Sequence, residues 1–452
     1  MKNREKTALV LSGGGSCGSY EIGVWAALRK LHISIDIVCG TSVGALNGAM
    51  IVMDKFHDAE RFWVDVTTDK IFDIDLPART ELSTEKAEDT GGVYLKDRSK
   101  KLIKELAENI SGRISPDMVN DIYKYTGKDL EQIISRFTAA EHEDADEKKH
   151  LSGMSMEEAF GYAKDMLLHG GVGSSRLMDI LKGFIDEAYF RSSPVDYCLV
   201  TAELPSMKGH FLNKASIPVG KLHDYIIASA SCFPAAHYHE IDGVKYVDGG
   251  YADNMPVRMA FSMGAQKIIA VDLGQPGRVR YDELKAVGSM VSELNVITPS
   301  SSTGNFLSFN ADTARRNLRL GEMDTMKTLG RYDGRYMTFK KGAFDTESLR
   351  EADAAGKVFG LDPFILYSQK KFDRDLNEKV TAAQASYSQL VQRSVSAKKA
   401  VRELNGEMLA IFIARNLVSA GTKSPFVNKA AMKLISDYVL TAEYLIRAGM
   451  LK

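Results

Sequence analysis

The pentapeptide Gly40-Thr41-Ser42-Val43-Gly44 constrains this chain more than any other segment because of what lies on either side of it. A short β-prone run, Ile35 to Cys39, precedes it, and a helix-prone run, Ala45 to Met50, follows it. Strand, G-x-S-x-G and helix in this order form the context that a nucleophile elbow requires. The hydroxyl of Ser42 would then lie at a helix N-terminus, where free N–H groups favour negative charge. A glycine-rich turn without chemistry is the alternative.

A second glycine cluster, Ser12-Gly13-Gly14-Gly15-Ser16-Cys17-Gly18, follows a predicted buried strand over residues 7–11. A predicted helix over residues 20–31 comes after it. The N–H groups of consecutive glycines are free to point at an anion, such as the oxyanion of a tetrahedral intermediate. The run also matches G-x-G-x-x-G of dinucleotide-binding proteins, which needs an acidic residue about 20 residues further on. Asp36 lies near that distance but opens the strand that ends in the pentapeptide, so we favour the oxyanion interpretation.

The third signal is Tyr246-Val247-Asp248-Gly249-Gly250, which follows a β-prone run. This order predicts a carboxylate at the end of a strand, on a flexible turn. Alone the signal is weak, because Asp-Gly is a common turn dipeptide. Together with the two glycine-rich segments it supplies a candidate base for Ser42.

These three segments resemble the patatin-like phospholipases, a family of lipid acyl hydrolases. The resemblance extends from Thr7 to about Leu273, and it includes two further segments, residues 228–236 and 254–257. It implies a three-layer α/β/α fold with a mainly parallel sheet. It also implies a serine lipid acyl hydrolase, a phospholipase A type of enzyme that cleaves carboxylic esters without a cofactor or metal.

The resemblance assigns a role to each motif residue. Ser42 would be the nucleophile and Asp248 the base of a Ser-Asp dyad, with no histidine taking part. The oxyanion hole would come from Gly13, Gly14, Gly15 and Gly18, and the motif glycines would be Gly40, Gly44, Gly249 and Gly250. A Ser-His-Asp triad that uses His237 or His239 is the rival, because both histidines lie close to Asp248 in the sequence.

Cys17 departs from the family pattern, in which many members carry Arg or Lys at this place in the glycine loop. A cation there would help to hold an anionic oxygen or a lipid phosphate. Its absence leaves ester cleavage unaffected but puts a preference for phospholipids in doubt. We interpret Cys17 as a small tolerated side chain, with a redox-sensitive thiol at the helix N-terminus as the alternative.

Composition limits the other possibilities. With 452 residues and 44% hydrophobic residues, the chain can form one large α/β domain and a smaller one. A net charge of −1 provides no field that would favour nucleic acid. The four cysteines form no CxxC pair, so zinc, a disulfide framework and an oxidising compartment are not indicated. We see neither a signal peptide nor an apolar run of membrane-spanning length, and expect a cytoplasmic protein that meets lipid at a membrane or micelle surface.

Changes in pattern predict the domain limits. We expect a catalytic domain over 1–275, an extension that packs on it over 276–343, and a helical C-terminal subdomain over 344–452. Charge runs between about 75 and 169 indicate an insertion with solvated faces; a lid carrying Ile133, Ile134 and Phe137 is the alternative. The C-terminal helices would pack together, or would dock on lipid. A lipid-binding module with incidental catalysis is the hypothesis from another class.

Overall fold

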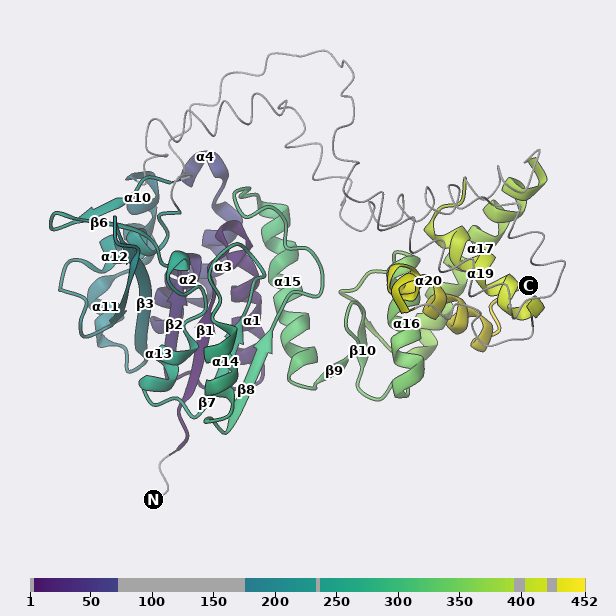
Figure 1. Ribbon diagram of the computed structural model, residues 1–452, viewed down its shortest axis with the longest axis horizontal. Coiled ribbons are helices and arrows are strands. Elements are labelled where there is room, and N and C mark those ends of the chain that lie inside the picture. Colours follow the sequence, from purple (N-terminus) through teal and green to yellow (C-terminus); the bar gives the residue numbers. More distant parts are fainter. Residues whose placement is uncertain (1–3, 72–174, 233–235, 394–402, 421–428, 452) are drawn as a thin grey trace, which may run out of the picture. The chain divides into compact units, whose positions relative to one another are not determined.

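The computed structural model describes residues 4–71, 175–232, 236–393, 403–420 and 429–451 (Figure 1). The expected insertion at 75–169, with its candidate lid residues, lies outside the described residues. The chain forms two compact units that divide between Tyr332 and Asp333. The described part of the first unit is 4–71, 175–232 and 236–332, and the second unit begins at 333.

An eight-stranded sheet forms the centre of the first unit, in the order β5-β6-β3-β2-β1-β7-β8 with β4 paired to β3. The strands are β1 (Thr7–Leu11), β2 (Ile37–Thr41), β3 (Asp196–Glu203), β4 (Lys208–Asn213), β5 (His239–Ile241), β6 (Val244–Asp248), β7 (Lys267–Val271) and β8 (Glu293–Ile297). From β3 through β8 every neighbouring pair is parallel, whereas β4, β5 and β6 join by antiparallel pairing. Every residue of β1 and β2 is buried, as expected of parallel strands covered on both faces.

Helices cover both faces of this sheet, so the expected three-layer α/β/α fold is confirmed. On one face α13 (Val257–Ser262) and α14 (Tyr281–Gly288) pack against the side chains of Ala8 and Val10. The other helices of the first unit are α1 (Ser19–Lys30), α2 (Val43–Val52), α3 (Phe56–Asp65), α4 (Thr68–Ile71), α10 (Ser175–Phe184), α11 (Glu187–Ser192), α12 (Leu222–Ser229) and α15 (Ala311–Thr328). Among them α2 packs on β1, β2 and β3, and α1 packs on α15.

The strand order reverses between β1 and β7, and this reversal positions the candidate site. From β1 the chain proceeds to β2 and β3 on one side, and from β7 it proceeds to β8 on the other. Since parallel crossovers are right-handed, the two halves carry their helices on opposite faces. A crevice therefore opens at the carboxyl ends of β1 and β7, where ligands of such sheets bind.

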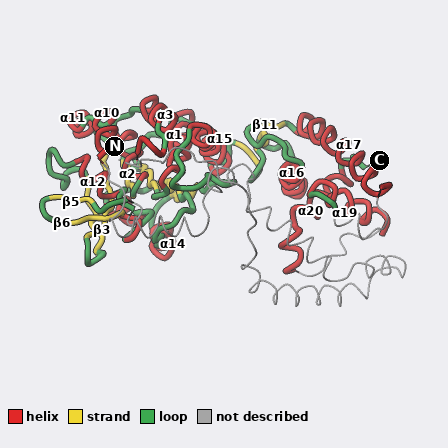
Figure 2. The backbone as a smooth tube through the Cα atoms, turned by 90° about the horizontal axis from the view of Figure 1, so that it is seen from above, coloured by secondary structure: helices red, strands yellow, loops and turns green. Residues whose placement is uncertain are grey.

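The second unit contains a small sheet and a helical core. The sheet has the order β11-β10-β9, with β9 (Tyr332–Asp333), β10 (Thr338–Lys340) and β11 (Leu366–Tyr367). The helices are α16 (Thr346–Val358), α17 (Gln369–Arg393), α19 (Gly406–Ala420) and α20 (Lys429–Arg447); Figure 2 shows α16, α17, α19 and α20 as separate red coils. No helix in the described ranges combines the length and apolar character that crossing a membrane would require.

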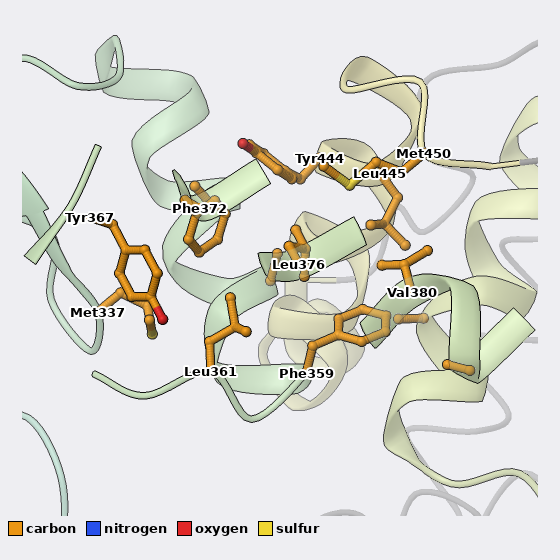
Figure 3. Packing of buried hydrophobic residues seen from close by; sticks show 14 of the residues in the cluster. Met337, Phe359, Leu361, Tyr367, Phe372, Leu376, Val380, Tyr444, Leu445 and Met450 are labelled. Atoms are coloured by element: carbon orange, nitrogen blue, oxygen red, sulfur yellow. The ribbon is translucent and has the colours of Figure 1, made fainter. Parts of the chain in front are cut away.

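Aromatic side chains fill the core of the second unit (Figure 3). The ring of Phe372 contacts Phe339, Phe344 and Tyr444 edge to face, with centroid distances of 5.1, 5.9 and 5.7 Å. Farther along α17, Leu376 and Val380 are fully buried in the same cluster. The apolar face of α17 is thus used in packing within the unit.

Truncation of the central ring tests this core. We expect Phe372→Ala to lower the free energy of unfolding of the second unit by about 3–5 kcal/mol, because the cavity cannot collapse among so many rings. Urea unfolding followed by far-UV circular dichroism measures the loss. Tryptophan fluorescence reports on the first unit alone, since both tryptophans, Trp25 and Trp63, lie there. Leu366→Ala is the control, because this residue is 36% exposed. An equally small effect of both substitutions would contradict the central place of Phe372 in the core.

Candidate active site

Ser42 lies in a strained turn between β2 and α2. Its φ of +56° and ψ of −125° are unusual for a residue with a side chain, and such backbone costs of order 1–3 kcal/mol. The turn is held because the Ser42 N–H donates to Ser229 Oγ at 2.9 Å, and that hydroxyl donates in turn to the Val200 carbonyl at 2.6 Å. Ser42 thus lies at a tight strand-to-helix turn.

The two motif glycines on either side of Ser42 allow the strand and the helix to approach. A Cβ on Gly40 would lie 2.2 Å from the Gly44 carbonyl oxygen, and a Cβ on Gly44 would lie 2.5 Å from the Leu11 carbonyl oxygen. No side chain fits at either position without displacing backbone. The pattern G-x-S-x-G is thus a packing requirement of this turn.

Asp248 ends β6 and lies against Ser42. The Ser42 hydroxyl donates a hydrogen bond to the buried carboxylate, and the Gly250 N–H donates to its Oδ1 at 2.7 Å. Burial raises the pKa of Asp248 to about 6, although both hydrogen bonds act to lower it. Removal from water, which disfavours the charged carboxylate, is thus the dominant influence.

The glycine loop joins β1 to α1 and lies over Ser42. The Gly13 N–H already donates to Asn254, to its Oδ1 at 3.1 Å and its carbonyl oxygen at 3.3 Å. Among the described residues, the N–H groups of Gly14 and Gly15 have no such acceptor. Gly18 is the residue before α1, and its carbonyl accepts from Asn47 Nδ2 at 2.9 Å.

A cavity of about 210 Å³ joins these parts. Gly13, Gly14, Gly15, Ser42, Asp248 and Gly250 line it, whereas Gly18, Gly40, Gly44 and Gly249 do not belong to the described lining. The rest of the described lining is mostly apolar and contains neither Lys nor Arg. Its larger apolar side chains are Val43, Leu46, Phe62, Trp63, Ile71, Leu177, Ile227, Phe306, Leu307 and Phe309. This environment suits an apolar ligand.

The alternative histidines lie elsewhere. His239 Nε2 is 3.0 Å from Asp224 Oδ1, and His237 Nδ1 is 2.8 Å from the Tyr238 carbonyl oxygen. Neither lines the cavity, and in the part of the chain that the structure describes no histidine does. The group in contact with Ser42 is Asp248.

Two further sequence alternatives can be compared with the structure. Asp36 accepts a hydrogen bond from the Thr7 N–H at 2.9 Å and pairs with Arg4, at the amino ends of β1 and β2. It therefore lies at the opposite edge of the sheet from the glycine loop, where it cannot contact a ribose. Cys17 is fully buried, with its Sγ 3.8 Å from the Thr303 carbonyl oxygen and 3.7 Å from that of Gly304.

Three kinds of residue escaped the sequence analysis. Ser229 and Asn254 both belong to segments of the family resemblance, but nothing in the sequence indicates which atoms they contact. Cys232 lines the cavity, and burial together with Asp248 raises its pKa to about 11. Phe306 and Phe309 come from the stretch before α15, in which no sequence motif indicates a cavity.

The fold and site define a doubly wound α/β protein with a strained serine turn beside a buried carboxylate. The patatin-like phospholipase family model matches residues 9–261, and the chain belongs to this family. Lysophospholipase nte1 of Aspergillus terreus is 52% identical over 46 residues, which are 10% of this chain and 3% of that protein. Patatin-like phospholipase domain-containing protein 7 of Mus musculus is 39% identical over 54 residues, 12% of this chain and 4% of the relative. The chain thus matches only a small part of these relatives.

Two solved structures align with most of this chain at low TM-scores. VipD from Legionella pneumophila has a TM-score of 0.36 at 13% identity, covering 99% of this chain and 85% of VipD. The ExoU–SpcU complex of Pseudomonas aeruginosa has a TM-score of 0.27 at 12% identity, covering 98% of this chain and 75% of the matched chain.

The raised pKa of Asp248 predicts a pH-dependent stability. The pKa of Asp248 is higher in the folded than in the unfolded protein, so its ionisation lowers the free energy of unfolding. This loss is small near pH 4, grows up to about pH 6 and is constant above it. A difference of about two pKa units corresponds to roughly 3 kcal/mol. Asp248→Asn, which keeps an acceptor for Gly250, should therefore raise the stability of the first unit above wild type by up to that amount at pH 7.5, and by much less at pH 4.

Urea unfolding followed by tryptophan fluorescence at the two pH values measures this gain. Asp65→Asn, at an exposed carboxylate on α3, is the matched control and should follow the wild-type pH dependence. An equal gain at both pH values would mean that the charge of Asp248 is not the cause.

Proposed function

We propose that this chain is a serine lipid acyl hydrolase that cleaves carboxylic ester bonds of lipids, phospholipids included, through a dyad of Ser42 and Asp248. The observation that carries the proposal is the hydrogen bond from the Ser42 hydroxyl to a buried carboxylate at the end of an apolar cavity. Membership of the patatin-like phospholipase family supports the same reaction class.

In the first step Ser42 Oγ attacks the ester carbonyl carbon while its proton passes to Asp248. Negative charge develops on the carbonyl oxygen, and we assign its stabilisation to the N–H groups of Gly14 and Gly15 and to the N-terminus of α2. Collapse of the tetrahedral intermediate breaks the bond to the alcohol, which takes the proton from Asp248. Water then hydrolyses the acyl-enzyme by the same route, and Ser42 regains its proton.

Burial of Asp248 explains how a carboxylate can replace a histidine. A carboxylate with an ordinary pKa near 4 is a weak base at neutral pH. With a pKa of about 6 the base is stronger, yet still ionised at pH 7. The apolar walls that receive the acyl chain thus also raise the pKa of Asp248.

The cavity supports an acyl chain inside and a head group outside. Tyr251, 41% exposed, and Leu307, 37% exposed, line the cavity and are also open to solvent. We propose that the ester enters past these side chains from a membrane or micelle surface. Lipid profiling of purified protein against Ser42→Ala, on mixed phospholipids, lysophospholipids and acylglycerols, identifies the head group.

Substitution of the dyad tests the reaction. On p-nitrophenyl butyrate, Ser42→Ala should reduce turnover to background, and Asp248→Asn should reduce kcat by about 10²–10⁴-fold, the share of general acid–base catalysis. His237→Ala and His239→Ala are controls expected to stay within about twofold of wild type. A fluorophosphonate probe should label wild type and not Ser42→Ala. If the probe labels neither wild type nor Ser42→Ala while both proteins are folded, the result would favour a lipid-binding module.

The base also predicts a pH profile. Asp248 must be ionised to accept the Ser42 proton, so kcat/KM should be constant above about pH 6 and should fall tenfold per pH unit below it. Initial rates on a non-ionising ester between pH 4.5 and 8 measure the profile. A rate that stays constant down to pH 4.5 would show that this carboxylate is not the base.

A further inference from the structure

Asn254 is a buried polar residue that the proposed reaction does not yet use. It lies after the acid turn, lines the cavity and is 2% exposed. Both ends of its carboxamide are bonded to one residue of the glycine loop. The Gly13 N–H donates to Oδ1 at 3.1 Å, and Nδ2 donates to the Gly13 carbonyl oxygen at 3.3 Å.

This reciprocal pair fixes the orientation of the next peptide group. In a planar trans peptide the N–H of Gly14 points opposite to the C=O of Gly13. Because Nδ2 of Asn254 holds that C=O, the Gly14 N–H is directed away from the amide. The contact is close: a Cβ on Gly13 would lie 2.5 Å from Asn254 Oδ1 and 2.9 Å from Ser42 Cβ.

The backbone of Asn254 is linked to the acid turn as well. Its N–H donates to the Arg278 carbonyl at 2.8 Å, and the Arg278 N–H donates to the Gly250 carbonyl at 2.8 Å. Gly250 in turn donates to Asp248 Oδ1 at 2.7 Å. One continuous set of hydrogen bonds therefore runs from the carboxylate through Asn254 to the glycine loop.

We infer that Asn254 is a positioning residue, whose carboxamide orients the Gly13–Gly14 peptide so that the oxyanion hole consists of Gly14 and Gly15 and excludes Gly13. This inference rests on the proposed function. The two neighbouring N–H groups then have different roles. The Gly13 N–H holds the loop through its bond to Asn254, and the Gly14 N–H donates to the oxyanion.

Asn254→Ala removes the donor to the Gly13 carbonyl and leaves the Gly13 N–H only its backbone acceptor. Since the oxyanion forms only in the transition state, kcat and kcat/KM should fall together, by roughly a hundredfold, while KM stays unchanged. Asn317→Ala is the matched control, because Asn317 is also fully buried and donates to a backbone carbonyl, that of Thr303, at 2.8 Å. It should lose stability and keep its kcat within about twofold.

Asn254→Asp keeps the shape of the side chain and provides a second measurement if the alanine variant does not fold. A carboxylate can accept from the Gly13 N–H but cannot donate to its carbonyl, so kcat should still fall. The new charge would also be close to the base, since a Cβ on Gly250 would lie 3.0 Å from Asn254 Oδ1 and 3.1 Å from Asp248 Oδ1. Like charge disfavours ionisation, so the acid limb of the pH profile should move to higher pH.

The outcomes separate the inference from the proposed function. Loss of kcat in both Asn254 variants with an upward shift of the acid limb in Asn254→Asp supports the inference. Folded Asn254 variants that keep wild-type kcat, beside an inactive Ser42→Ala, would overturn it and leave the hydrolase intact. Ester hydrolysis that survives in Ser42→Ala would instead overturn the proposed function.

Discussion

A carboxylate removed from water beside a serine hydroxyl is the interaction on which the candidate active site depends. Burial opposes ionisation of Asp248, and the hydrogen bonds from Ser42 and Gly250 offset only part of that cost. The sheet around this carboxylate is well packed, since β1 and β2 are buried throughout. Asp248 itself ends β6, which pairs antiparallel with β3. The buried charge of Asp248 thus lowers the stability of the first unit, and the packing of the residues around it offsets this loss.

The backbone at Ser42 is likewise in an unfavourable conformation that surrounding contacts stabilise. A positive φ at a serine persists only where neighbours determine it, and here the N–H of Ser42 is bonded to Ser229 while Gly40 and Gly44 make room for the crossing backbone. Ser229 comes from α12 and Asn254 from the loop before α13. Segments far apart in the sequence therefore meet at the carboxyl edge of the sheet, close to the point where the strand order reverses.

The sequence predicted the elements that carry local signals. Strands β1, β2 and β6 and the turn at Ser42 follow from β-prone runs that end in glycine-rich segments, and the α/β fold and the family were confirmed. The partners of these elements could not be predicted in the same way. Ser229 and Asn254 are polar residues in ordinary contexts, and their importance arises from bonds to residues 187 and 241 positions away. The histidines near Asp248 in the sequence are turned to other partners, because neighbours along an antiparallel hairpin need not face one site.

Cys232 has a consequence for the choice of covalent reagents. This thiol lines the same cavity as Ser42, but its high pKa leaves it almost wholly protonated at neutral pH, and a protonated thiol is a poor nucleophile. Soft electrophiles such as maleimides should therefore react slowly with Cys232. Electrophiles centred on phosphorus or on an activated carbonyl are better suited to Oγ of Ser42, the proposed nucleophile. Burial of the thiol, with a smaller contribution from Asp248, would then set the selectivity between Cys232 and the proposed nucleophile Ser42.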